Sequence, residues 1–245
     1  MQIKGFIKNS LNEWEGQIAS VVFLPYCNLS CPYCHAGHLI SNPEELETVP
    51  RHEIYNYLQG ERGWVDGVSI TGGEPTLHGE KLAQFIRELK AMDIEVMLET
   101  NGTRPQWIGR LIDEGLLDAV AMDVKAPLTR ADYRRVTRKA VDPKKIRSSI
   151  HRIIDSGLSH EFRTTLAPDL LDEDDLKRLA PELEGAEKVA LQNFQPENCL
   201  DEELRHGTPF FPEAMDEFQQ IFEPYVERCV LRGRKRGVSV AASRA

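Results

Sequence analysis

The stretch VVFLPYCNLSCPYCH, residues 21–35, places a cysteine-rich segment directly after an apolar, β-branched run. The run QIASVVFL (17–24) predicts a buried strand that ends before Pro25. The residues after it are rich in asparagine, serine and proline, so a loop is expected at the carboxyl end of that strand. This loop contains three of the chain's five cysteines: Cys27, Cys31 and Cys34.

Strand-like and helical patterns alternate along the rest of the chain. Further strands are expected at residues 67–71, 94–100, 118–124, 161–166 and 188–194. Helical patterns lie at residues 43–59 (interrupted at Pro50), 79–92, 104–115, 143–157 and 172–185, and a terminal helix is expected within 209–233. Six strands alternating with helices favour an α/β fold with a parallel sheet, best matched by a partial (β/α)6 TIM-like barrel. An open Rossmann-like sheet is the alternative, but no G-x-G-x-x-G follows the first strand.

Composition narrows the class of protein. The 245 residues suit one domain over residues 1–231, followed by a basic, flexible tail over residues 232–245. No apolar run is long enough to span a membrane and the start lacks the pattern of a secretory signal, so a cytoplasmic protein without a membrane partner is expected. A net charge of −9 argues against a nucleic-acid partner. Residues 130–152 contain nine Lys or Arg and two Asp, which favours a solvated helical surface over a docking site for an acidic partner.

Clustered cysteines in a chain with an odd cysteine count more often hold metal than form disulfides. Cys199 and Cys229 lie far from the cluster and are expected to be free thiols. The spacing in the loop suits an iron–sulfur cluster, and three ligands in place of the usual four leave one iron open to an exogenous ligand. A zinc site with His35 as fourth ligand is an alternative, although His35 directly follows Cys34 and adjacent residues seldom converge on one ion. A chance group of buried cysteines is the third interpretation.

The C-x-x-x-C-x-x-C spacing is the signature of the radical S-adenosylmethionine (SAM) enzymes, which this chain resembles. The resemblance implies a barrel of that type, with one [4Fe–4S] cluster on the three cysteines and SAM on its open iron. It also implies reductive cleavage of SAM to a 5′-deoxyadenosyl radical that abstracts a substrate hydrogen. Tyr33 is at the position where the family packs the SAM adenine. Thr71, Gly72, Gly73 and Glu74 resemble the family's GGE motif, in which backbone carbonyls and a carboxylate accept from the methionyl ammonium.

The opening GFIKNSLNEWEG (5–16) and the segments TGGEPTL, ETNGT, MDVKAP and EFRTTLAP resemble the activating proteins of glycyl radical enzymes, specifically those of anaerobic ribonucleotide reductase. That resemblance implies a glycyl radical enzyme as partner and a flavodoxin or ferredoxin-type reductant. It also implies SAM contacts at Glu99, Thr100, Asp123, Lys125 and Arg163. A monovalent cation near the SAM carboxylate is a further implication. Gln192 is a further candidate.

From the residues alone, Asp123 and Lys125 predict an ion pair or solvated strand-end charges, and Arg163 a surface arginine on a strand. Four positions depart from the pattern of the activating proteins, and these departures concern the partner's identity more than the SAM chemistry: Glu15 replaces Pro, Tyr26 replaces Gly, Ala36 replaces Asn and Glu99 replaces Asp. The alternative function is a small-molecule radical SAM enzyme similar to the 7-carboxy-7-deazaguanine synthases. An iron–sulfur protein without turnover would leave the GGE and D-x-K segments unexplained.

Overall fold

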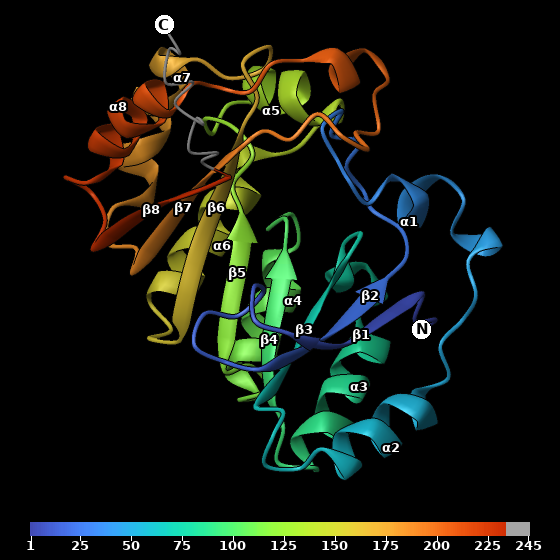
Figure 1. Ribbon diagram of the computed structural model, residues 1–245. Helices are drawn as coiled ribbons and strands as arrows, with labels where there is room; N and C mark the ends of the chain where they lie inside the picture. The colour runs from blue at the N-terminus through green and yellow to red at the C-terminus, as the bar shows by residue number, and fades with distance from the viewer. Residues whose placement is uncertain (234–245) are drawn as a thin grey trace, which may run out of the picture.

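The computed structural model of the protein describes residues 1–233, and within them one strongly curved sheet is flanked by helices (Figure 1). The strands follow one another in the sheet in the same order as in the chain. They are β1 (Gly5–Ser10), β2 (Ala19–Leu24), β3 (Gly67–Gly72), β4 (Glu95–Thr100), β5 (Ala119–Asp123), β6 (Ser159–Leu166), β7 (Lys188–Asn193) and β8 (Arg228–Arg232). β1 is antiparallel to β2, and every later pair is parallel. The predicted α/β barrel with six alternating strands is confirmed by β2 to β7.

The helices connect successive parallel strands, and α3 shows why they pack against the sheet. They are α1 (Gly37–Ser41), α2 (Arg51–Gly60), α3 (Glu80–Lys90), α4 (Pro105–Asp113), α5 (Arg130–Thr137), α6 (Pro143–Ile154), α7 (Glu173–Leu179) and α8 (Pro212–Phe222), with short 3-10 turns at Pro43–Glu45, Pro75–His78, Ala180–Leu183 and Glu203–His206. The apolar face predicted for α3 is buried: Leu82, Phe85, Ile86 and Leu89. No helix in residues 1–233 is long and apolar enough to cross a membrane.

Two edge strands were not predicted, and one of them corrects an expectation. The terminal helix expected within 209–233 ends at Phe222, and residues 228–232 form β8, parallel to β7. The prediction was wrong there because RCVLR is too short to show a period, and its pairing with β7 decides its conformation. β1 escaped notice because its residues are half-buried or exposed, as an edge strand allows. The predicted tail includes Arg232, the last residue of β8, and residues 234–245 lie outside the described part of the chain.

Connections at both ends of the strands link the cysteine side of the sheet to β7 and β8. At the amino-terminal end, the β1–β2 loop passes in front of β4 and β5 in Figure 1, and Trp14 packs on Met97 and on two small residues of β5. Glu15 from the same loop pairs with Lys188 on β7 and Arg228 on β8. At the carboxyl end, the segment after β7 donates two backbone hydrogen bonds to the cysteine loop, of 3.0 and 2.9 Å. The open edges of the barrel are therefore tied together at both ends.

Candidate active site

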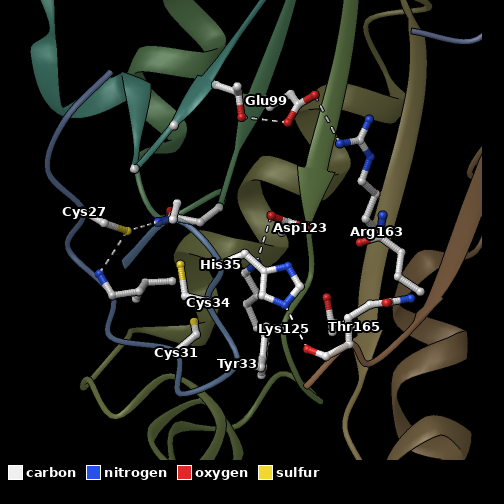
Figure 2. Close-up of a pocket in the computed structure, with 18 of the residues that line it drawn as sticks. Cys27, Cys31, Tyr33, Cys34, His35, Glu99, Asp123, Lys125, Arg163 and Thr165 are labelled. Carbon is white, nitrogen blue, oxygen red and sulfur yellow. Dashed lines mark hydrogen bonds and ion pairs between the residues drawn. The ribbon is translucent and has the colours of Figure 1, made fainter. Parts of the chain in front are cut away.

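A cavity of about 580 Å³ lies where the parallel strands end, which is where barrel enzymes place their chemistry (Figure 2). Most of the predicted site residues line it: Cys27, Cys31, Tyr33, Cys34, Thr71, Gly72, Gly73, Glu99, Thr100, Asp123, Lys125, Arg163 and also Gln192. In Figure 2 the cysteines lie on one side of the cavity, and Arg163 and Thr165 on the other. The strand ends thus bring together residues that are more than 160 positions apart in the chain.

The cysteine loop presents three thiols to this cavity. A tight turn, closed by a 3.0 Å hydrogen bond from the Cys34 amide to the Cys31 carbonyl, brings those two residues together. The sulfur of Cys27 accepts from the backbone N–H of Leu29 at 3.4 Å and from the side-chain amide of Asn101 at 3.7 Å. Burial raises the pKa of the Cys27 thiol to about 11 and that of Cys31 to about 12. Iron must therefore displace protons when it binds.

The donor set fits an iron–sulfur cluster better than a zinc ion. Within residues 1–233, no group of three or more His, Cys, Asp or Glu side chains converges on a single metal ion. His35, the fourth ligand of the zinc alternative, instead places its Nε2 atom 2.9 Å from the carbonyl oxygen of Gln195. Three thiols without a convergent nitrogen or oxygen ligand are the donors that an iron–sulfur cluster takes.

The glycines after β3 lie directly against the start of the cysteine loop. Gly73 donates a 2.8 Å hydrogen bond to the Leu24 carbonyl, and the next amide donates to Tyr26 at 2.7 Å. A Cβ atom on Gly73 would overlap the Tyr26 carbonyl, and Gly72 has a φ of 119°, which side chains rarely allow. The two glycines are needed because the strand end and the cysteine loop approach backbone to backbone.

Glu74 corrects the expected role of the GGE carboxylate. Its side chain is fully buried and does not line the cavity. The carboxylate accepts hydrogen bonds from the backbone and hydroxyl of Thr76, from the Thr100 hydroxyl at 2.7 Å and from the Asn101 amide at 2.7 Å. Burial raises the pKa of Glu74 against these donors. Glu74 thus joins the end of β3 to the end of β4 rather than facing a ligand.

The D-x-K pair forms the ion pair that the residues alone predicted. Lys125 Nζ lies 2.8 Å from Asp123 Oδ2, and the ammonium is 5.8 Å from the centroid of the Tyr33 ring. Burial alone lowers the pKa of Lys125, but the charge of Asp123 outweighs it and raises that pKa well above its usual value. Among the described residues, the Tyr33 hydroxyl is buried without a hydrogen-bond partner.

Glu99 and Arg163 form the charged wall opposite the cysteines. Arg163 Nη1 is 3.2 Å from Glu99 Oε1, and the Thr71 hydroxyl donates to Glu99 Oε2 at 2.8 Å. Arg163 lies beside Asp123 in the β5–β6 register. Only 9% of Arg163 is exposed, so the alternative of a surface arginine is wrong. Its position follows from strand alternation, which turns every second side chain of β6 inward.

Several residues that line the cavity were not predicted as site residues: Glu13, His35, Asn101, Thr165, Asn193, Gln195 and Arg232. Asn101 could have been found, because it stands in the ETNGT segment that was already singled out. The contribution of Arg232 depends on β8, a strand without a recognisable sequence period.

Comparison with known proteins decides the family. A family model described as the Radical SAM superfamily matches residues 21–180. The chain belongs to the radical SAM superfamily. A protein of Methanocaldococcus jannaschii named "Putative glycyl-radical enzyme activating enzyme MJ1227" is 30% identical over 234 residues, 94% of this chain and 95% of that protein.

Two further likenesses place this radical SAM protein among its relatives. The 7-carboxy-7-deazaguanine synthase of Geobacter sulfurreducens is 34% identical over 121 residues, which cover 42% of this chain and 47% of that enzyme. The structure of Streptococcus suis SuiB bound to S-adenosylmethionine matches with a TM-score of 0.65 at 13% identity, over 87% of this chain and 52% of that one, a likeness of fold. Membership in the family makes the protein an enzyme that acts through radical chemistry and implies a [4Fe–4S] cluster and SAM as its cofactors.

Proposed function

We propose that this radical SAM enzyme generates a glycyl radical on a partner enzyme, namely an anaerobic ribonucleotide reductase. The observation that carries the proposal is the cavity in which three cysteine thiols face the charged wall of Glu99 and Arg163. The nearly full-length similarity to a protein named as a glycyl-radical enzyme activating enzyme supports the activation of a protein partner.

The residues of the cavity divide the work of binding between them. Cys27, Cys31 and Cys34 would hold a [4Fe–4S] cluster, which, when bound and reduced by a flavodoxin or ferredoxin-type protein, supplies the electron that cleaves SAM into methionine and a 5′-deoxyadenosyl radical. The backbone of Gly72 and Gly73 lines the cavity beside this loop, and its carbonyl oxygens would accept from the methionyl ammonium.

The charged residues orient the carboxylate, which is at the same methionyl end of SAM as the ammonium. The guanidinium of Arg163 is available to the methionyl carboxylate because it lines the cavity and is already held by Glu99. Glu99, Thr100 and Asp123 supply oxygen atoms for a monovalent cation beside that carboxylate. The Tyr33 ring, next to the Lys125 ammonium, provides an apolar surface for the adenine.

The target of the radical would be a glycine in an exposed loop of the partner. Abstraction of a Cα hydrogen from glycine gives a radical stabilised by the two flanking amides, so this enzyme need only position the loop and exclude solvent. Gln192, Asn193 and Gln195 line the cavity, and amide side chains both donate to and accept from a peptide backbone.

The basic surface of α5 is proposed as a contact for an acidic segment of that partner. Much of the charge in residues 130–152 is neutralised internally: Arg135 pairs with Asp132 and Asp175, and Arg147 pairs with Glu182. Arg134 is exposed and has no ion pair to another described residue. α5 adjoins the cysteine loop, since the Ser30 amide donates to the carbonyl of Thr137, the last residue of α5, at 3.0 Å. The basic surface therefore adjoins the loop that lines the cavity.

A small-molecule radical SAM activity is the alternative. It is not favoured, because the similarity to a 7-carboxy-7-deazaguanine synthase covers 42% of this chain, against 94% for the activating-enzyme relative.

Electron paramagnetic resonance tests the proposal. Anaerobically reconstituted protein, reductant, SAM and an anaerobic ribonucleotide reductase are expected to give the doublet of a glycyl radical, and Cys31→Ala should abolish it. Cleavage of SAM without that doublet would contradict the proposed partner, and absence of any cleavage would contradict the proposed chemistry.

A further inference from the structure

Glu161 on β6 carries a carboxylate that three cations from three strands surround. Arg163 Nε lies 2.6 Å from Oε1, and Lys188 Nζ, from β7, lies 2.6 Å from Oε2. Arg232, from β8, binds both oxygens, at 2.7 and 2.9 Å. Only 8% of the Glu161 side chain is exposed.

This arrangement keeps Glu161 ionised inside the barrel. Burial alone would raise the pKa of its carboxyl group, but the surrounding cations, led by Arg163, lower it below its usual value. Paired cations and anions at this depth are costly to separate, because a remaining charge would be buried without a partner. The carboxylate and its cations therefore behave as one fixed unit.

Arg163 depends on this unit for its orientation. Besides Nε on Glu161, its Nη1 contacts Glu99 and its Nη2 donates to the Glu13 carbonyl at 3.2 Å. The guanidinium plane is thus determined by β6, β4 and the β1–β2 loop. Arg163 and Arg232 line the cavity that contains the cysteine thiols, whereas Glu161 does not. Glu161 can influence a ligand there only through the groups that it binds.

We propose that Glu161 is a positioning residue that holds the Arg163 guanidinium, and with it the Arg232 guanidinium, at the cavity wall in the orientation that binds SAM. The inference rests on the proposed role of Arg163 as a SAM contact. Without the Glu161 charge, Lys188 and the two arginines share no common anion. The mutual repulsion of these three cations then rotates the guanidinium groups of Arg163 and Arg232 out of the planes in which Glu161 holds them.

The affinity for SAM, measured by equilibrium dialysis on anaerobically reconstituted protein, tests this inference. Glu161→Gln keeps the shape of the side chain and removes its charge, and we expect the Kd for SAM to rise about 10- to 100-fold, as for other residues that orient a ligand's direct contacts. Iron per chain should stay at the parent value. The matched control is Glu182→Gln, which likewise removes the charge of a carboxylate bound to an arginine. The Glu182 carboxylate accepts from Nε and Nη2 of Arg147, at 2.9 and 2.6 Å, and neither residue lines the cavity. An unchanged or lower Kd in Glu161→Gln, or a rise of the same size in the control, overturns the inference.

A double-variant cycle separates positioning from a general structural role. If Glu161 acts through Arg163, then Glu161→Gln adds little to the loss of affinity caused by Arg163→Lys, and additive losses overturn the inference. If Glu161→Gln does not fold, Glu161→Asp keeps the charge but is too short to reach all three cations. It should give an intermediate Kd, and a parental Kd would contradict the role. These measurements need no partner enzyme, so absence of a glycyl radical with the affinity loss intact would contradict only the proposed partner.

Discussion

Gly73→Ala is expected to displace the cysteine loop, because the added methyl group has no room against backbone. Its Cβ would overlap the Tyr26 carbonyl and lie 3.2 Å from the Cys27 amide nitrogen. Non-bonded carbon contacts are comfortable at about 3.5–4.0 Å, so the peptide between Tyr26 and Cys27 has to move on the order of 1 Å. A side chain could rotate away from such an overlap, but a backbone carbonyl cannot.

The magnitude follows from the contacts that this shift breaks. Forcing a methyl group into a packed site costs about 1–3 kcal/mol, and the 2.8 and 2.7 Å hydrogen bonds that join β3 to the loop are each worth about 1 kcal/mol. A loss of about 3 kcal/mol in the free energy of unfolding lowers the Tm of a protein of this size by about 6–12 °C. The shift also moves Cys27, and metal binding is sensitive to the geometry of its ligands. Iron per chain after anaerobic reconstitution should therefore fall by about half or more.

Gly60→Ala is the matched control, since it makes the same substitution at the last residue of α2, where nothing lies within 4 Å of the new Cβ atom. It should leave the iron content unchanged and the Tm unchanged or slightly raised. Thermal unfolding followed by circular dichroism and a colorimetric iron assay measure both effects. Equal Tm values and iron contents in the two variants would refute the argument that backbone contact at Gly73 positions the cysteine loop.

Three further outcomes are expected. The Arg178 hydrogen bonds hold the pKa of Asp132 well below its usual range. The ionised Asp132 carboxylate therefore stabilises the fold above about pH 4, and this stabilisation is lost as the pH falls. Asp132→Asn should lower the Tm by about 2–6 °C at pH 7 in thermal melts, and by less toward pH 2. Cys199→Ser and Cys229→Ser should retain the parent's iron per chain, since neither residue lines the cavity, and a loss of iron would make that cysteine a ligand. Arg134→Glu should slow glycyl-radical formation on the order of 10-fold at low salt without changing the Kd for SAM.

Arg62→Glu is the control for the basic surface of α5. Arg62 precedes β3, at the amino-terminal ends of the parallel strands, and its ion pair with Asp93 is exposed. The same charge reversal there should leave the rate of glycyl-radical formation unchanged. Equal slowing by Arg62→Glu and Arg134→Glu would mean that net charge, rather than the α5 surface, controls association.

Local patterns predicted the central strands and the cysteine loop, because both depend on neighbouring residues. Gln17–Leu24 was expected as a buried strand, and β2 occupies Ala19–Leu24. The buried face of α3 could be predicted because four apolar residues repeat at helical spacing. β8 was not, since five residues carry no usable period and their conformation depends on pairing with β7.

The charges inside the barrel were harder to predict than its apolar core. Glu161 and Arg163 alternate along β6, and alternating charged residues ordinarily indicate a strand with one solvated face. They are buried here because residues of β4, β7 and β8 form ion pairs with them. No local sequence pattern predicts these pairings between strands. For Glu74 the motif was recognised, but the direction of the side chain was not predicted. That direction depends on hydrogen bonds from Thr100 and Asn101, which lie at the end of the neighbouring strand β4.

Transfer of a glycine Cα hydrogen tests the central claim most directly. The partner enzyme is prepared with glycine deuterated at Cα, mixed anaerobically with reconstituted protein, reductant and SAM, and the 5′-deoxyadenosine is analysed by mass spectrometry. Deuterium in the 5′-deoxyadenosine, absent when Cys31→Ala is used, is the predicted result. Unlabelled 5′-deoxyadenosine formed at the same rate with and without the partner would contradict the assignment of a glycyl radical enzyme as the substrate.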